Sequence, residues 1–98
     1  MDFQIVYASQ LKQVLRESRG ILIDIRDPED YKKGHWSGAV NYPYEKFEEG
    51  RLRLPKNRKL ILYCEHGGGS MQIARRLGRE GYLVATVVGG YEALRKLR

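Results

Sequence analysis

The feature that most constrains the fold is an apolar run that ends at a cysteine and leads through glycines into a helical pattern. Residues 60–63 are Leu-Ile-Leu-Tyr, a short continuous apolar run that is typical of a buried strand. Cys64 follows at once, and beyond Gly67, Gly68 and Gly69 the apolar residues recur at helical spacing. The stretch therefore predicts a strand, a tight turn and a helix, with the only cysteine of the chain at the junction.

The same alternation of strand and helix patterns continues through the rest of the chain. Further strands are expected at residues 3–6, 21–25, 38–42 and 83–88, and helices at 9–17, 28–33, 44–49, 70–80 and 93–97. Gly20 is expected to stop the first helix, and Ser70 to cap the helix after the cysteine. We therefore expect one α/β domain over residues 1–98, with a mostly parallel β-sheet of about five strands flanked by helices on both faces.

Composition limits the class of protein. Ninety-eight residues with 42% hydrophobic side chains suffice for one domain with a core, and a single cysteine cannot form an internal disulfide. A lone cysteine also indicates a reducing compartment. The first residues do not resemble a signal peptide, and no apolar run approaches the ~20 residues of a transmembrane helix. We therefore expect a cytoplasmic protein, or a soluble piece of a larger one, with no membrane partner.

The net charge of +6 is unevenly spread along the chain. Residues 1–50 hold 7 Lys and Arg against 9 Asp and Glu, which gives −2, whereas residues 51–98 hold 11 against 3, which gives +8. The half that contains Cys64 should therefore attract small anions. Its basic residues are dispersed, and no zinc-finger or RNA-recognition signature is present, so no nucleic-acid partner is expected.

The setting of Cys64 favours a nucleophile over a structural residue. Successive glycines allow backbone N–H groups to converge, and these groups together with a helix N-terminus favour negative charge, hence a reactive thiolate. The alternative is a small buried hydrophobe that ends the strand, but a packed core has no use for three glycines in a row. A zinc site of Cys64 with His66 and His35 lacks the paired ligand spacing, so no metal is expected. His35 is interpreted as structural.

Two polar residues follow the strand at 21–25 and should reach the same edge of the sheet as the cysteine. Ligands of parallel sheets bind beyond the carboxyl ends of the strands, so Asp24 and Arg26 are candidates for catalysis. Such a pair more often forms a satisfied ion pair with neighbouring loops, and we favour that interpretation.

Several segments together resemble the rhodanese family. Residues 22–31 followed by 34–41, with the Gly-His-x-x-Gly-Ala pattern, match its strand and helix, and Cys64 with its glycines resembles its active-site loop. Gly89 and Gly90 resemble its late double glycine. The resemblance implies a rhodanese-like fold and a sulfurtransferase without cofactor. Such an enzyme moves sulfane sulfur from a donor such as thiosulfate to cyanide or a thiol through a persulfide on the cysteine.

The resemblance also implies roles for the residues of the loop. Cys64 would be catalytic, and the rest of the loop would bind substrate through backbone N–H groups: Glu65, His66, Gly67, Gly68, Gly69 and Ser70. The implied partners are a small anionic sulfur donor and a possible protein thiol as acceptor. Gly69 stands where many members have an arginine, and Glu65 adds a negative charge beside the nucleophile, so we expect weakened use of thiosulfate.

Two alternatives to a sulfurtransferase remain. A rhodanese-like module can serve binding or regulation without catalysis, although the presence of Cys64 argues against it. A cysteine-dependent phosphatase or arsenate reductase is a weaker alternative. Phosphotyrosine-type chemistry needs an arginine six residues after the cysteine to clamp phosphate, and Ser70 stands there.

Overall fold

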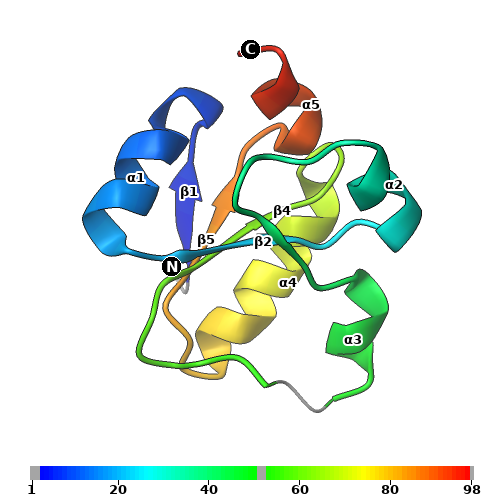
Figure 1. Ribbon diagram of the computed structural model, residues 1–98. Coiled ribbons are helices and arrows are strands. Elements are labelled where there is room, and N and C mark those ends of the chain that lie inside the picture. Colours follow the sequence, from blue (N-terminus) through cyan, green and yellow to red (C-terminus); the bar gives the residue numbers. More distant parts are fainter. Residues whose placement is uncertain (1–2, 51–52, 98) are drawn as a thin grey trace.

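Five strands form one parallel sheet in the order β1-β5-β4-β2-β3 (Figure 1). The computed structural model describes residues 3–50 and 53–97. The strands are β1 (Gln4–Val6), β2 (Ile21–Asp24), β3 (Val40–Asn41), β4 (Leu60–Tyr63) and β5 (Val84–Val87). The predicted α/β fold with a parallel sheet is confirmed, and β4, which leads into the cysteine, is its central strand.

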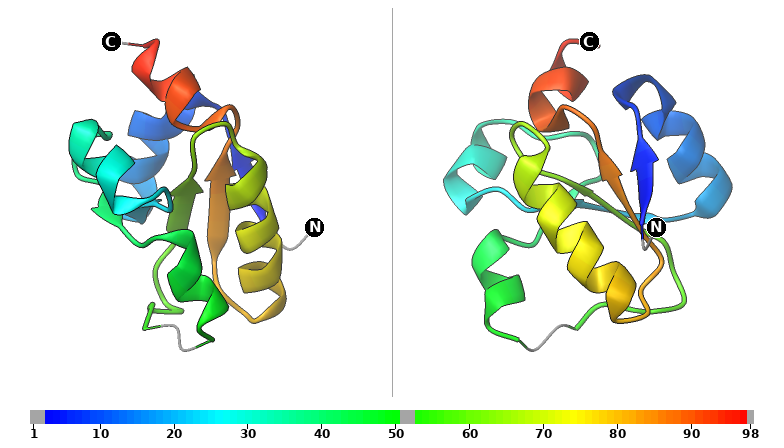
Figure 2. Two further views of the ribbon diagram at one scale, coloured as in Figure 1. Left: turned by 90° about the vertical axis from the view of Figure 1, so that its right-hand side faces the viewer. Right: turned by 180° about the vertical axis from the view of Figure 1, so that it is seen from behind.

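Helices cover both faces of the sheet, as the edge-on view shows (Figure 2). They are α1 (Leu11–Ser18), which follows a 3-10 turn at Ala8–Gln10, α2 (Pro28–Lys33), α3 (Tyr44–Glu48), α4 (Gly68–Arg79) and α5 (Gly90–Arg95). The apolar residues of α3 and α4 pack on one face, and those of α1, α2 and α5 pack on the other. In residues 3–50 and 53–97, no helix has the length and apolar character needed to cross a bilayer.

The central strand supplies the core on both faces. Leu60 and Leu62 belong to the cluster under α3 and α4, while Ile61 and Tyr63 belong to the cluster under α1 and α5. All four side chains are fully buried. Because successive side chains of a strand point to opposite faces, a strand covered on both sides must be apolar at every position. This is why the run before the cysteine shows no alternation.

The predicted end of the first helix is wrong by one residue. Arg19, and not Gly20, takes the left-handed conformation, with φ of 54°, and its N–H donates to the carbonyl of Leu15 over 3.0 Å. Gly20 is needed for a different reason: a Cβ there would lie 2.8 Å from the carbonyl oxygen of Lys59. The glycine thus permits close contact with the chain entering β4, which no local pattern could reveal.

Other boundaries differ at their ends. The helix after the cysteine begins at Gly68, with Gly67 as its N-cap residue at φ of 107°, so the prediction of Ser70 as its cap is wrong. The third strand is shorter than predicted, and the last helix begins three residues earlier, at Gly90. Residues 51–59 are basic and contain Pro55, which predicts a surface connection into β4. The structure describes this segment only from residue 53, and residues 51 and 52 lie outside the described part of the chain.

Candidate active site

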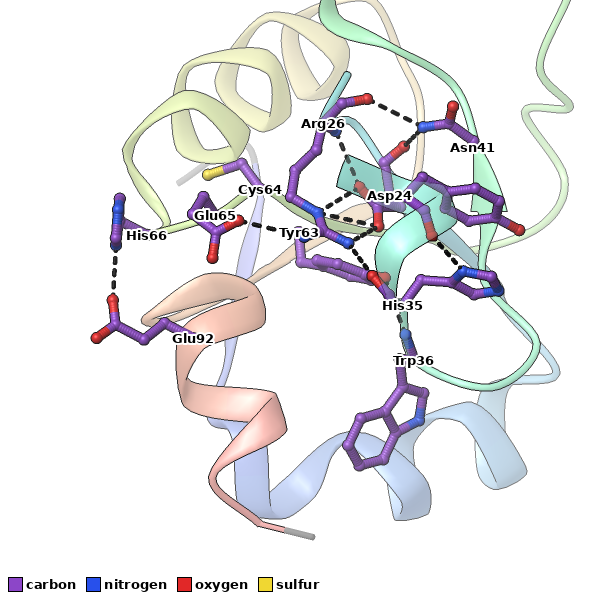
Figure 3. Close-up of polar contacts among 12 residues, drawn as sticks. Asp24, Arg26, His35, Trp36, Asn41, Tyr63, Cys64, Glu65, His66 and Glu92 are labelled. Carbon is purple, nitrogen blue, oxygen red and sulfur yellow. Dashed lines mark hydrogen bonds and ion pairs between the residues drawn. The ribbon is translucent and has the colours of Figure 1, made fainter. Parts of the chain in front are cut away.

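Cys64 lies at the carboxyl edge of the sheet, between the end of β4 and the start of α4 (Figure 3). The residue is partly buried. Because all five strands are parallel, the segments that follow β2 and β5 reach the same edge. The site is therefore built from three parts of the chain: residues 64–70, here called the cysteine loop, residues 24–26 after β2, and the double glycine after β5.

Two backbone N–H groups point at the sulfur of Cys64. The N–H of Gly67 donates to Sγ over 3.0 Å and that of Ser70 over 3.4 Å. The positive φ of Gly67 turns the chain so that these two donors converge. Such a pair of donors suits a negatively charged group at this position.

The other two glycines of the cysteine loop have a different role from the one expected. Gly68 and Gly69 form the first turn of α4 and have ordinary helical conformations, so only Gly67 needs a left-handed backbone. A Cβ at position 69 would lie 3.9 Å from the sulfur, whereas a Cβ at position 68 would meet nothing within 4 Å. Glycine at position 69 therefore keeps one side of the sulfur uncovered.

Ser70 supports the loop from behind. Its side chain is fully buried, and its hydroxyl hydrogen-bonds the carbonyl oxygen of Gly67 over 3.2 Å and Thr86 Oγ1 over 2.7 Å. Thr86 lies on β5, so the start of α4 is fastened to the neighbouring strand. The backbone N–H of Ser70 is directed at the sulfur, while its buried hydroxyl joins the loop to β5.

The double glycine after β5 is explained by its contact with the cysteine loop. A Cβ on Gly90 would clash with the carbonyl oxygen of Cys64 and would lie 2.7 Å from that of Glu65. Because no side chain intervenes, the N–H of Tyr91 donates to the carbonyl of Cys64 over 2.7 Å, and that of Glu92 donates to the carbonyl of Glu65 over 3.1 Å. The first turn of α5 thereby holds the first two residues of the loop.

Arg26 connects the remaining parts of the site. Its guanidinium donates to Asp24 Oδ2 over 2.7 Å and to the carbonyl of Gly34 over 2.7 Å, and its Nη1 lies 3.2 Å from Glu65 Oε1. It also lies over the ring of Tyr91, 4.1 Å from the centroid. The predicted Asp24–Arg26 ion pair is present, and both side chains are buried.

The electrostatics of Arg26 follow from this burial. Desolvation disfavours the charged guanidinium, but the hydrogen bonds and the charge of Asp24 outweigh it and hold the pKa of Arg26 above its ordinary value. Tyr63, at the end of β4, is buried in the same region, and burial raises the pKa of its hydroxyl. The phenol is therefore neutral at physiological pH, and its oxygen accepts a hydrogen bond from the backbone N–H of Trp36.

Glu65 is not oriented as a free charge beside the nucleophile. Its carboxylate accepts a hydrogen bond from Arg26, a cation 39 residues away along the chain, and this contact offsets part of its negative charge. Residue spacing alone gave no signal for this pair, because the contact depends on β2 and β4 being neighbours in the sheet.

The two histidines contact different residues. His66 is exposed and its Nδ1 lies 2.8 Å from Glu92 Oε2, while the ring of His35 stacks on Tyr31. In the part of the chain that the structure describes, no group of three or more His, Cys, Asp or Glu side chains is arranged to hold a metal ion.

Comparison with known proteins places the chain in a family. The model of the rhodanese-like domain matches residues 7–97. The thiosulfate sulfurtransferase GlpE of Coxiella burnetii is 29% identical over 73 residues, which cover 74% of this chain and 68% of that protein.

Solved structures agree with this match. A rhodanese-related protein from Thermoplasma volcanium superposes with a TM-score of 0.87 at 21% identity, over 97% of this chain and 93% of that one. The reduced CoADR-RHD protein of Bacillus anthracis superposes with a TM-score of 0.84 at 26% identity over 95% of this chain, which spans only 16% of that protein's length. With the family match over residues 7–97, this chain belongs to the rhodanese-like domain family.

Proposed function

We propose that this chain is a sulfurtransferase in which Cys64 carries sulfane sulfur from a donor such as thiosulfate to a thiophilic acceptor. The observation that carries the proposal is the sulfur of Cys64 at the carboxyl edge of the sheet, with the N–H groups of Gly67 and Ser70 directed at it. The similarity to the thiosulfate sulfurtransferase GlpE supports the reaction class.

The proposed reaction has two covalent steps. The Cys64 thiolate attacks the outer sulfur of thiosulfate, the S–S bond of the donor breaks, and its electron pair leaves on sulfite. A persulfide now extends from Sγ. Cyanide or a thiolate then attacks the outer sulfur, the bond to Sγ breaks, and the electron pair returns to Cys64 as thiolate. The N–H groups of Gly67 and Ser70 would stabilise the anionic sulfur in each step.

The contacts of Ser70 disfavour the phosphatase alternative. A phosphate clamp at this position needs a bidentate donor such as arginine. The Ser70 hydroxyl is instead buried and already bonded to Gly67 and Thr86.

The test is the intact mass of the protein after incubation with thiosulfate. We expect one added sulfur atom, removed by cyanide with release of thiocyanate. Cys64→Ser should acquire no sulfur while keeping the native circular dichroism spectrum, because the substitution changes the nucleophile and little else. A wild-type protein that gains no sulfur, or a Cys64→Ser variant with near wild-type turnover, would contradict the proposed persulfide.

A further inference from the structure

Behind the cysteine loop lies a pair of buried hydroxyl groups. Thr86 of β5 and Ser70 of α4 are 1% and 0% exposed, and their side-chain oxygens lie 2.7 Å apart. Val84, two residues before Thr86, packs under α3 and α4, so the side chain of Thr86 points to that face of the sheet. Cys64 packs on the same face. The hydroxyl pair and the nucleophile therefore lie on the same side of the sheet.

The directions of the hydrogen bonds follow from the number of protons. The Ser70 hydroxyl carries one proton, and the carbonyl oxygen of Gly67, 3.2 Å away, can only accept. Ser70 must therefore donate to Gly67, and its oxygen accepts a hydrogen bond from the hydroxyl of Thr86. These two bonds form a chain, here called the hydroxyl chain, that runs from Thr86 through Ser70 to the carbonyl of Gly67.

The hydroxyl chain ends on the two residues whose N–H groups face the sulfur. Gly67 donates to Cys64 Sγ over 3.0 Å, and Ser70 donates to it over 3.4 Å. The carbonyl of Gly67 also accepts a hydrogen bond from the N–H of Met71 over 3.2 Å, at the start of α4. Ser70 thus holds Gly67 through its side chain and presents a donor of its own, so a movement of Ser70 displaces both donors.

Burial makes the Thr86 hydroxyl difficult to replace. Because both side chains are excluded from solvent, bulk water cannot supply the hydrogen bond that Thr86 donates to Ser70. A buried oxygen that loses its donor favours a new orientation, and rotation of the Ser70 side chain would release the carbonyl of Gly67. β5 is paired with β1 on one side and with β4 on the other, so Thr86 is attached to a fixed part of the sheet.

We propose that Thr86 is a positioning residue for sulfur transfer: its hydroxyl, acting through Ser70, keeps the N–H groups of Gly67 and Ser70 directed at the sulfur. Donors that are held in place before the reaction stabilise developing charge without reorganisation, and displaced donors lose part of this effect. The inference rests on the proposed function and adds to it a residue of a neighbouring strand.

Two substitutions separate the hydroxyl of Thr86 from its shape. Thr86→Val replaces the hydroxyl with a methyl group, whereas Thr86→Ser keeps the hydroxyl and removes the methyl group. The readout is the single-turnover rate of persulfide formation from saturating thiosulfate, followed by intact mass. We expect Thr86→Val to slow this rate roughly five- to fiftyfold, which is less than the roughly hundred- to thousandfold cost of losing a donor. Thr86→Ser should stay within about twofold of wild type, because it keeps the hydroxyl chain.

The Ser70→Ala variant removes the middle of the hydroxyl chain and tests whether Thr86 acts through it. It keeps the backbone N–H and should slow the reaction by about the same factor as Thr86→Val. Adding Thr86→Val to Ser70→Ala should then slow the reaction no further, because the chain is already broken. Factors that multiply in the double variant would show that Thr86 acts by another route, and would overturn the proposal.

Ser18→Ala is the control for stability. It removes a part-buried hydroxyl that donates to the carbonyl of Val14 over 2.6 Å and accepts from the N–H of Gly20 over 3.1 Å. This hydroxyl lies just before β2 begins, at the edge of the sheet opposite Cys64. The variant should have a lower Tm and a wild-type rate of persulfide formation. All rates are measured well below the Tm of each variant, so that unfolded protein does not contribute.

The outcomes separate the positioning role from the proposed function. A wild-type rate in Thr86→Val, or a Thr86→Ser variant that is equally slow, would overturn the positioning role and leave the sulfurtransferase intact. If Thr86→Val does not fold, Ser70→Ala decides, since a wild-type rate in that variant also overturns the positioning role. Absence of the persulfide in wild-type protein would overturn the proposed function, and the positioning role with it.

Discussion

At the residue scale, the ion pair between Glu65 and Arg26 reduces the electrostatic repulsion that the carboxylate next to Cys64 would exert on an anionic donor. Arg26, Asp24 and Glu65 together carry one net negative charge, and the first two are buried. The sequence alone placed Glu65 as a free charge that repels an anionic donor. In the structure, part of its field is offset by the guanidinium 3.2 Å away, which also pairs with Asp24.

We predict that Glu65→Gln raises kcat/KM for thiosulfate about two- to threefold at low ionic strength. The glutamine can still accept a hydrogen bond from Arg26, so the loop should keep its position while the local net charge becomes zero. Kinetics over a salt series measure the effect, and Glu80→Gln is the matched control at the far end of α4. Equal gains in the two variants would mean that only the total charge of the protein matters.

At the scale of elements, the position of α5 depends on a glycine that admits no side chain. Gly90 brings the first turn of α5 against the carbonyl groups of Cys64 and Glu65. The helix has only six residues, so most of what fixes its place must be tertiary contact.

We predict that Gly90→Ala destabilises the fold by roughly 1–3 kcal/mol, since an added methyl in a packed contact forces the backbone to shift. Sulfur transfer should fall as well, because the displaced helix releases the carbonyl of Cys64. Thermal unfolding gives the readout, with about 4–8 °C of Tm per kcal/mol for a domain of this size. The contrasting variant for stability is Gly68→Ala, whose Cβ meets nothing within 4 Å and whose Tm should hold or rise. An equal Tm for the two variants would show that the contact of α5 with the loop is not tight.

At the scale of the whole molecule, the charge distribution favours anions at the half that bears the cysteine. The net charge is +6, and residues 51–98 alone contribute +8. A long-range field of this kind raises the local concentration of an anionic reagent and weakens as salt screens it.

We predict that alkylation of Cys64 by iodoacetate slows about two- to fivefold between low and physiological ionic strength, whereas alkylation by uncharged iodoacetamide stays nearly constant. The comparison needs no sulfur-transfer activity, and free cysteine under the same conditions corrects for salt effects on the reagents. Parallel salt dependence of the two reagents on the protein would show that the positive charge does not act at the site.

The sequence by itself determined the alternation of strands and helices, the central buried strand and the cysteine at its end. Hydrophobic periodicity and turn residues determine secondary structure through interactions between residues that are close in sequence. Residues 60–63 and the glycines after Cys64 therefore suffice to predict that junction. Only the tertiary structure decided which side chains meet there. Because β4 lies between β2 and β5, the segments after three strands converge, which pairs Arg26 with Glu65 and sets Gly90 against the loop. Those contacts join residues that are distant along the chain, and no local pattern encodes the order of strands that brings them together.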